Sequence, residues 1–277
     1  MGYIESLEDV KEYRGLSDRG TSNRGLSQPK TEGQSSAANA VASATRPSTS
    51  AVSSPVGAAG WFDGFANSYT GEAISENDWE VAAKELSCEV AAIKAVAQVE
   101  SGPLGAYWKP GWPTILFERH LFSKHSGRRF DKSNPDISSS TLYRFAKPAE
   151  KKGGLKDDMY AWTPVDNYAR LERAYALDAT AALKSPSWGR FQVLGQNHKD
   201  AGYPASVQDY VKAMCTSEKE QLVAFVRFLK ADARLLDGIR KRDWKGFAAA
   251  YNGVNYAMFN YDARLSNAYD SQTPKGS

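Results

Sequence analysis

The segment Ala95-Val96-Ala97-Gln98-Val99-Glu100-Ser101-Gly102 places a carboxylate at the end of an apolar helix. Apolar residues recur every three or four positions from residue 90 to residue 97, as in the buried stripe of a helix, and Ser87 is the predicted N-cap. A helix-stopping glycine follows at Gly102, so Glu100 is predicted to lie in the last turn. There the carboxylate faces the negative end of the helix dipole beside an apolar face, and both effects disfavour its charged form. Glu100 is therefore a candidate general acid; the alternative is a solvated residue at a helix end.

Aromatic residues are unevenly distributed along the 277 residues. No Phe, Trp or Tyr occurs between Tyr13 and Trp61, and all seven Trp lie from Trp61 onward. Between Leu16 and Gly60 the chain consists mostly of Ser, Ala, Gly, Thr and Pro, which offer little to bury. We therefore predict a flexible, disordered arm or linker at residues 1–60 and one globular domain at residues 61–277.

The charge and the reactive side chains exclude several classes of function. The formal net charge of +3 is too small to indicate nucleic-acid binding, and no apolar run is long enough for a membrane span. The acidic N-terminus is unlike a secretory signal, so we expect synthesis in the cytoplasm without a signal peptide. The two cysteines, Cys88 and Cys215, are far apart and are predicted to be buried free thiols. His120, His125 and His198 have no metal-ligand spacing, so no metal and no cofactor are predicted.

Helix signals dominate the globular part, and the predicted class is mainly α. Ser75, Ser206 and Ser217 are each followed three residues later by an acidic residue, which is typical of a helix start. A further helix from Trp244 is predicted to stop at Asn252-Gly253. Two segments are less clear: Ile115-Leu116-Phe117 fits a strand or the start of a helix, and Ser187 is expected to cap a short helix over residues 188–194.

Three separated motifs occur in the order found in the lysozyme-like superfamily, which includes goose-type lysozymes and soluble lytic transglycosylases. They are Val99-Glu100-Ser101-Gly102, Ser187-Trp188-Gly189-Arg190-Phe191-Gln192-Val193-Leu194-Gly195 and Ala250-Tyr251-Asn252-Gly253. The chain resembles more closely the phage-type N-acetylmuramidase domain of endolysins, over about residues 75 to 270. That resemblance also rests on Ile115-Leu116-Phe117-Glu118-Arg119-His120, Tyr168-Ala169-Arg170-Leu171-Glu172-Arg173-Ala174 and Tyr261-Asp262. It implies a lysozyme-like α+β fold with a small β region.

The resemblance implies hydrolysis of the glycan strand of bacterial peptidoglycan, between N-acetylmuramic acid and N-acetylglucosamine. Such a reaction needs a protonated carboxyl group and usually a second carboxylate. Glu100 fits the first role. Glu118 is the choice for the second, because it follows an apolar run inside a matching motif; the alternative is a structural ion pair with Arg119 or Arg128.

Further residues are expected to bind the substrate. By resemblance, Gln192 and Asn252 would hydrogen-bond the sugar or the attacking water, and Tyr251 would orient Glu100. Three tryptophans, Trp108, Trp112 and Trp188, are candidates for stacking on sugar faces; for each of them, packing in the core is the alternative. A capping role is likewise the alternative for Asn252. His120 and His198 are expected to be structural.

Two other functions compete with the muramidase: a lytic transglycosylase, which needs only one catalytic acid, and a wall-binding module without catalysis. The implied partner is peptidoglycan, with action on the cell wall in the periplasm or outside the cell. A monomer is expected, with access to the wall through a holin or a delivery machine.

Overall fold

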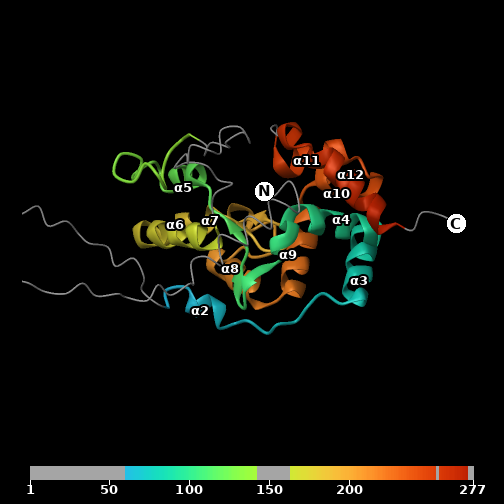
Figure 1. Cartoon of the computed structure of the whole chain (residues 1–277), viewed down its shortest axis with the longest axis horizontal. Coiled ribbons are helices and arrows are strands. Elements are labelled where there is room, and N and C mark those ends of the chain that lie inside the picture. Colours follow the sequence, from blue (N-terminus) through green and yellow to red (C-terminus); the bar gives the residue numbers. More distant parts are fainter. Residues whose placement is uncertain (1–59, 142–162, 254–255, 274–277) are drawn as a thin grey trace, which may run out of the picture.

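The computed structural model describes residues 60–141, 163–253 and 256–273, and within them the chain is mainly helical with two small sheets (Figure 1). The expected fold class is therefore confirmed, whereas the predicted arm lies outside the described residues except for Gly60. The α-helices are α2 (Asp63–Ala66), α3 (Glu76–Leu86), α4 (Val90–Ser101), α5 (Arg119–His125), α6 (Pro164–Leu177), α7 (Ala179–Lys184), α8 (Val207–Thr216), α9 (Glu218–Ala231), α10 (Ala233–Lys241), α11 (Trp244–Asn252) and α12 (Tyr261–Gln272). The short 3-10 helices are η1 (Gly102–Leu104), η4 (Gly195–Asn197) and η5 (Tyr256–Phe259).

The helix that carries Glu100, α4, is largely buried. Its core-facing residues include Ile93, Val96 and Val99, and it packs against α3 and α12. Ser87 is not its N-cap: this residue ends α3 in the left-handed conformation, and Glu89 precedes α4 without a side-chain cap. A left-handed residue is a common way to end a helix, and here it turns the chain from α3 into α4.

Two antiparallel sheets supply the β region. Strands β1 (Tyr107–Lys109) and β2 (Trp112–Pro113) form a hairpin that follows η1. Strands β3 (Ile115–Leu116), β4 (Ser187–Trp188) and β5 (Val193–Leu194) form the second sheet, with β4 in the centre. The helix expected over residues 188–194 is therefore wrong. Each end of this segment pairs with a neighbouring strand, which provides hydrogen bonds that a short isolated helix lacks.

The predicted helix starts depend on local hydrogen bonds, and the structure confirms them. Ser75 and Asp78 form a reciprocal capping box at the start of α3. Ser206 caps α8 and Ser217 caps α9 by accepting a hydrogen bond from the third residue of each helix. These hydroxyls satisfy backbone N–H groups that the first turn of a helix leaves without partners.

An aromatic cluster fixes the beginning of the described chain to the sheets. The ring of Phe62 is fully buried and lies 4.8 Å from Trp112, 5.2 Å from Tyr168 and 6.2 Å from Trp188, measured between ring centroids. Burial of a phenylalanine ring stabilises a fold by roughly 1.5–3 kcal/mol. The segment around Phe62 is therefore part of the core and not of a linker.

Two observations concern the rest of the described chain. Cys88 and Cys215 are both free thiols, as predicted, but only Cys215 is buried, since Cys88 is partly exposed after the end of α3. No helix in residues 60–141, 163–253 or 256–273 combines the length and apolar character needed to cross a membrane.

Candidate active site

Glu100 lies in the last turn of α4, as predicted, and is only 1% exposed. The next residue, Ser101, returns its hydroxyl to the carbonyl of Ala97 at 2.7 Å, so the helix keeps its geometry to the end. From α12, Arg264 donates to the carbonyl of Val99 at 3.3 Å. The carboxylate is thus held on a rigid element near the negative end of the helix dipole.

Tyr251 on α11 lies within electrostatic range of Glu100. Burial, and then the negative charge of Glu100, raise the pKa of Tyr251 well above its ordinary value. Its hydroxyl does not orient Glu100 by donating to it, because the single proton is donated to the carbonyl of Phe191 at 2.6 Å. Tyr251 therefore ties α11 to the turn between β4 and β5.

Gln192 occupies that turn with φ of +50°, in the left-handed region, and is 5% exposed. Its amide group makes three hydrogen bonds inside the protein. The Nε2 atom donates to the carbonyls of Thr114 at 3.0 Å and Gly189 at 2.8 Å, and Oε1 accepts from the hydroxyl of Ser187 at 2.7 Å. One donor bond of the amide therefore joins the hairpin to the segment before β3, and the other closes the β4–β5 turn on itself.

Asn252 is the last residue of α11 and is 7% exposed. Its Nδ2 group is buried and has no hydrogen-bond partner within the described chain. A buried donor without a partner costs roughly 1–3 kcal/mol, which a bound acceptor would offset. Asn252 follows Tyr251 directly at the end of α11.

Glu118 lies two residues after the end of β3 and is the N-cap residue of α5. It is 8% exposed, and its Oε2 lies 3.3 Å from Nδ1 of His120. This is an ion-pair distance without hydrogen-bond geometry. The alternative predicted for Glu118 was an ion pair with an arginine. In the described part of the chain Glu118 instead contacts His120, while Arg119 donates from Nε to the carbonyl of Thr141 at 2.9 Å.

The three-stranded sheet connects the two carboxylates through a short series of contacts. Strand β3, which leads to Glu118, pairs with β4. In the turn after β4, the backbone N–H of Gly189 donates a 2.8 Å hydrogen bond to the carbonyl of Thr114. The carbonyl of Phe191, in the same turn, accepts a hydrogen bond from the hydroxyl of Tyr251. The structure thus brings the motifs of Glu100, Gln192 and Tyr251 together and joins Glu118 to them through β3.

Trp108 and Trp112 lie on the β1–β2 hairpin and are half-buried. The ammonium group of Lys109 lies 4.7 Å from the ring centroid of Trp108 and 3.7 Å from that of Trp112. The Nε1 donor of Trp108 is buried and has no hydrogen-bond partner among the described residues. These rings remain candidates for substrate contact, with a lysine covering part of their surface.

Trp188 is a core residue, so the expectation that it stacks on a sugar is wrong. The indole is 1% exposed, lies parallel to Phe62 and donates from Nε1 to the carbonyl of Leu183 at 3.3 Å. A ring that is covered on its faces has no surface left for a sugar. The motif around Trp188 contributes packing, whereas the turn that follows contributes hydrogen bonds.

Sequence reasoning missed Thr114 at this site. Its carbonyl accepts both the Gly189 and the Gln192 hydrogen bonds, and its buried hydroxyl has no partner within the described chain. No local pattern distinguishes one threonine at the end of a proline-containing turn, so only the long-range pairing of β3 and β4 identifies it. His198, by contrast, is structural as expected, with Nδ1 at 2.7 Å from the carbonyl of Tyr203.

Two further features of the described residues lie outside this site. Within residues 60–141, 163–253 and 256–273, no group of three or more His, Cys, Asp or Glu side chains is arranged to hold a metal ion.

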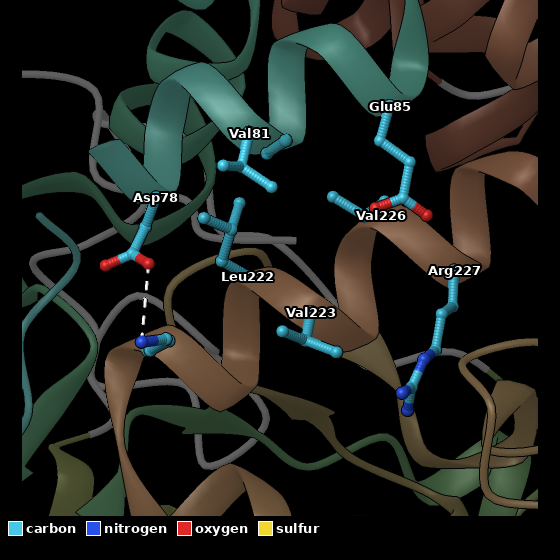
Figure 2. A pocket seen from close by; sticks show the side chains of 9 residues that line it. Asp78, Val81, Glu85, Leu222, Val223, Val226 and Arg227 are labelled. Atoms are coloured by element: carbon cyan, nitrogen blue, oxygen red, sulfur yellow. Dashed lines mark ion pairs between the residues drawn. The ribbon is translucent and has the colours of Figure 1, made fainter. Parts of the chain in front are cut away.

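A groove between α3 and α9 exposes Val81 (55%) opposite Leu222, as Figure 2 shows. Its acids, Asp78 and Glu85, are paired with Lys219 at 3.4 Å and Lys230 at 2.7 Å. None of the predicted site residues lines this groove, so it is not the candidate active site.

Comparisons with known proteins relate the chain to a family and to a solved structure. The family model described as N-acetylmuramidase matches residues 89–273, a range that contains both carboxylates and all the other predicted site residues. A solved structure described as the endolysin of Burkholderia AP3 phage matches with 36% identity and a TM-score of 0.57, covering 72% of this chain and 70% of that one. No curated protein matches the chain.

The matched range extends from the residue before α4 to the end of α12, so it includes α4 itself, α11 and α12. The predicted resemblance is confirmed by both comparisons. The chain belongs to the N-acetylmuramidase family of peptidoglycan hydrolases.

Proposed function

We propose that the protein hydrolyses the glycan strand of peptidoglycan between N-acetylmuramic acid and N-acetylglucosamine by acid–base catalysis. The observation that carries this proposal is the burial of Glu100 at the end of α4, next to the motif of Tyr251 and Asn252. The family match supports the same chemistry. Two carboxyl groups, one acid and one base or nucleophile, are the usual requirement for this reaction.

Glu100 is the proposed general acid, which protonates the leaving glycosidic oxygen. A carboxyl group that is 1% exposed on an apolar helix has little water to stabilise its charge. The end of α4 adds a field that opposes negative charge. Both effects favour the protonated form, which is the form that donates a proton.

Glu118 is the proposed second carboxylate, which activates water or stabilises the cationic transition state. Two features support this assignment. The positive end of α5 begins at this residue, and the His120 ring lies at ion-pair distance. A negative group placed in this way is chemically unlike Glu100, as a pair of residues with separate roles requires.

Three buried groups are proposed to bind the substrate near the carboxylates: the Nδ2 donor of Asn252, the Nε1 donor of Trp108 and the hydroxyl of Thr114. Trp112 is proposed to contact a sugar face when Lys109 moves aside. The amide of Gln192 and the hydroxyl of Tyr251 support the fold of the site and do not bind the substrate directly, because their donors already bond backbone carbonyls.

The biological role that we propose is bacterial lysis by a monomeric enzyme acting on the wall, in the periplasm or outside the cell. The similar solved structure is described as a phage endolysin. In this proposal the catalytic domain begins close to Trp61, because Phe62 belongs to the core, and residues 1–60 precede it as an arm.

Digestion of purified sacculi, with the products identified by mass spectrometry, tests the reaction. Reducing muramic ends are expected. Anhydro ends would replace the hydrolase with a lytic transglycosylase. Binding without release of soluble fragments would leave only a wall-binding module, and cut peptides on intact glycan would contradict all three.

A further inference from the structure

We propose that a basic surface at the end of α5 binds the carboxylates of the stem peptides attached to the glycan strand. This surface, called here the α5 basic patch, consists of Lys124, Arg128, Lys132 and Lys184. The proposal rests on the proposed function, because the peptides belong to the same substrate. It extends that function by making cleavage depend on the peptides and not on the glycan alone.

The positive charge of the chain is concentrated in this region. Residues 119–141 contain five Lys or Arg and two Asp, a net charge of +3, which equals the net charge of the whole chain. The side chains of Lys124, Arg128 and Lys132 are exposed and make no ion pair or hydrogen bond within the described chain. Many other surface cations in the described residues have acidic partners, for example Lys94, Lys219, Lys230, Lys241 and Arg242.

The chain folds back at the end of α5, which places these cations on one surface. Phe130 stacks on Phe122 of α5 at 5.8 Å and an interplanar angle of 10°. Arg128 has φ of +61°, and its backbone N–H donates to the carbonyl of Ser123 at 2.7 Å. Residues 127–132 are therefore held against the helix, so that the cations of the loop remain close to Lys124.

The nearby acids do not neutralise the patch from within. Asp131 accepts hydroxyl hydrogen bonds from Ser123 at 3.0 Å and Ser138 at 2.6 Å. Asp178 caps α7 and pairs with Arg129, a fifth cation of this region.

Lys184 joins the patch from α7, which packs against α5. The half-buried His125 lies between the two helices, with Nε2 at 3.0 Å from Oε1 of Gln196. Burial is the largest cause that lowers the pKa of His125, and Lys124 and Lys184 lower it further. Two cations from different helices thus act on one imidazole, which places them on the same side of the fold.

The position of the patch favours stem peptides over a separate anionic polymer. Helix α5 begins directly after Glu118 and has seven residues, so its length is about 10 Å at 1.5 Å per residue. An extended peptide spans roughly 10 Å in three residues. A peptide on a sugar bound near Glu118 can therefore reach the patch, and its carboxylates complement the lysine and arginine charges.

The test compares binding of inactive protein to two substrates. The background variant is Glu100→Gln, and the patch variant adds Lys124→Gln, Arg128→Gln and Lys132→Gln. The matched control instead adds Lys84→Gln, Lys212→Gln and Lys245→Gln, which removes three exposed cations from α3, α8 and α11. Binding is measured by pelleting with intact sacculi and with glycan strands stripped of peptides by an amidase, and thermal unfolding verifies the fold of each variant.

The patch variant is expected to bind intact sacculi about tenfold more weakly at low salt, since each exposed charge contact contributes a small factor. It is expected to bind stripped strands as well as the background variant does. Equal losses on both substrates, or an equal loss in the matched control, would overturn the proposal. Failure of the proposed function is a separate result, because wild-type protein would then release no reducing muramic ends whatever the pelleting shows.

Discussion

Glu100 lies at the C-terminal end of α4 and Glu118 at the N-terminal end of α5, and their surroundings differ accordingly. Glu100 ends α4 inside an apolar core formed with α3 and α12, whereas Glu118 begins α5 after a short strand and lies beside His120. The elements also differ in charge: α4 carries one cation, Lys94, paired with Glu76, whereas α5 leads into a basic loop. One sheet connects these two regions. The difference shows how a single fold gives two glutamates distinct chemistry through helix direction and burial.

The largest effect is expected for Glu100→Gln, which removes the ionisable proton and keeps the shape of the side chain. Activity on sacculi should fall about 10³-fold, or roughly 4 kcal/mol of transition-state stabilisation. The thermal unfolding midpoint should stay the same or rise, because an amide is buried more cheaply than a carboxylate. The loss of activity is measured as the initial rate at which reducing ends are released. A variant that retains most of its activity would remove Glu100 from the mechanism.

Glu118→Gln should reduce activity by about 10²-fold, a smaller loss, because water can attack slowly without a base. The products should still be reducing ends. Full activity in this variant, together with an inactive Glu100→Gln, would show that only Glu100 is catalytic. The enzyme would then be a transglycosylase with a single acid.

Gln192→Ala tests the connection between the two regions. The variant leaves the hydroxyl of Ser187 without its acceptor and removes one of the two hydrogen bonds at each of two backbone carbonyls. We expect a loss of roughly 2–4 kcal/mol in the free energy of unfolding. Gln192→Gly is the matched control, since it also relieves the left-handed backbone at φ +50°. It should recover about 1 kcal/mol of that loss. Equal stability of the two variants would show that the backbone there is not strained.

Tyr251→Phe should cost about 1 kcal/mol of unfolding free energy, because only the 2.6 Å hydrogen bond to Phe191 is lost while the ring stays in place. Activity should fall only a fewfold. Chemical denaturation and the kcat of the variant measure the two values. A loss of activity comparable to that of Glu100→Gln would instead place the hydroxyl in direct contact with the substrate.

The smallest effect concerns acid sensitivity on the Glu118 side. The pKa of His125 is lowered in the folded protein, so the unfolded chain binds a proton first as the pH falls. Stability should therefore decline as the pH drops below about 6.5, by less than about 1 kcal/mol for this half-exposed group. His125→Gln should reduce the decline, measured by the unfolding midpoint between pH 7 and pH 5.5. An unchanged decline would place the acid sensitivity elsewhere.

The sequence predicted what depends on local interactions. Capping by Ser75, Ser206 and Ser217 needs partners three residues away, so the pattern alone is sufficient. The stop of α11 at Asn252 and the place of Glu100 in the last turn of α4 follow from the same local rules. The family resemblance then related these separate segments to one fold, because one of its motifs includes Glu100.

What the sequence did not predict depends on distant partners. The segment after Ser187 became strands because β3 lies beside it, about 70 residues earlier in the chain, and local propensity carries no information on such a neighbour. Burial of Trp188 likewise depends on Phe62, from a region before the matched family range. The partner of Gln192 at Thr114 was also invisible, since the two residues lie 78 positions apart in the sequence. The contact of Glu118 with His120, by contrast, is local and was missed although the two residues lie in one motif.

The packing of α12 on α4 has a consequence for the timing of activity during synthesis. The ribosome completes α4 long before it makes α12, which supports the catalytic helix and directs Arg264 to the carbonyl of Val99. The helix that carries Glu100 therefore receives this support only after α12 has been made. A nascent chain that ends before α12 would lack this support, so we expect activity to arise only once α12 has folded against α4.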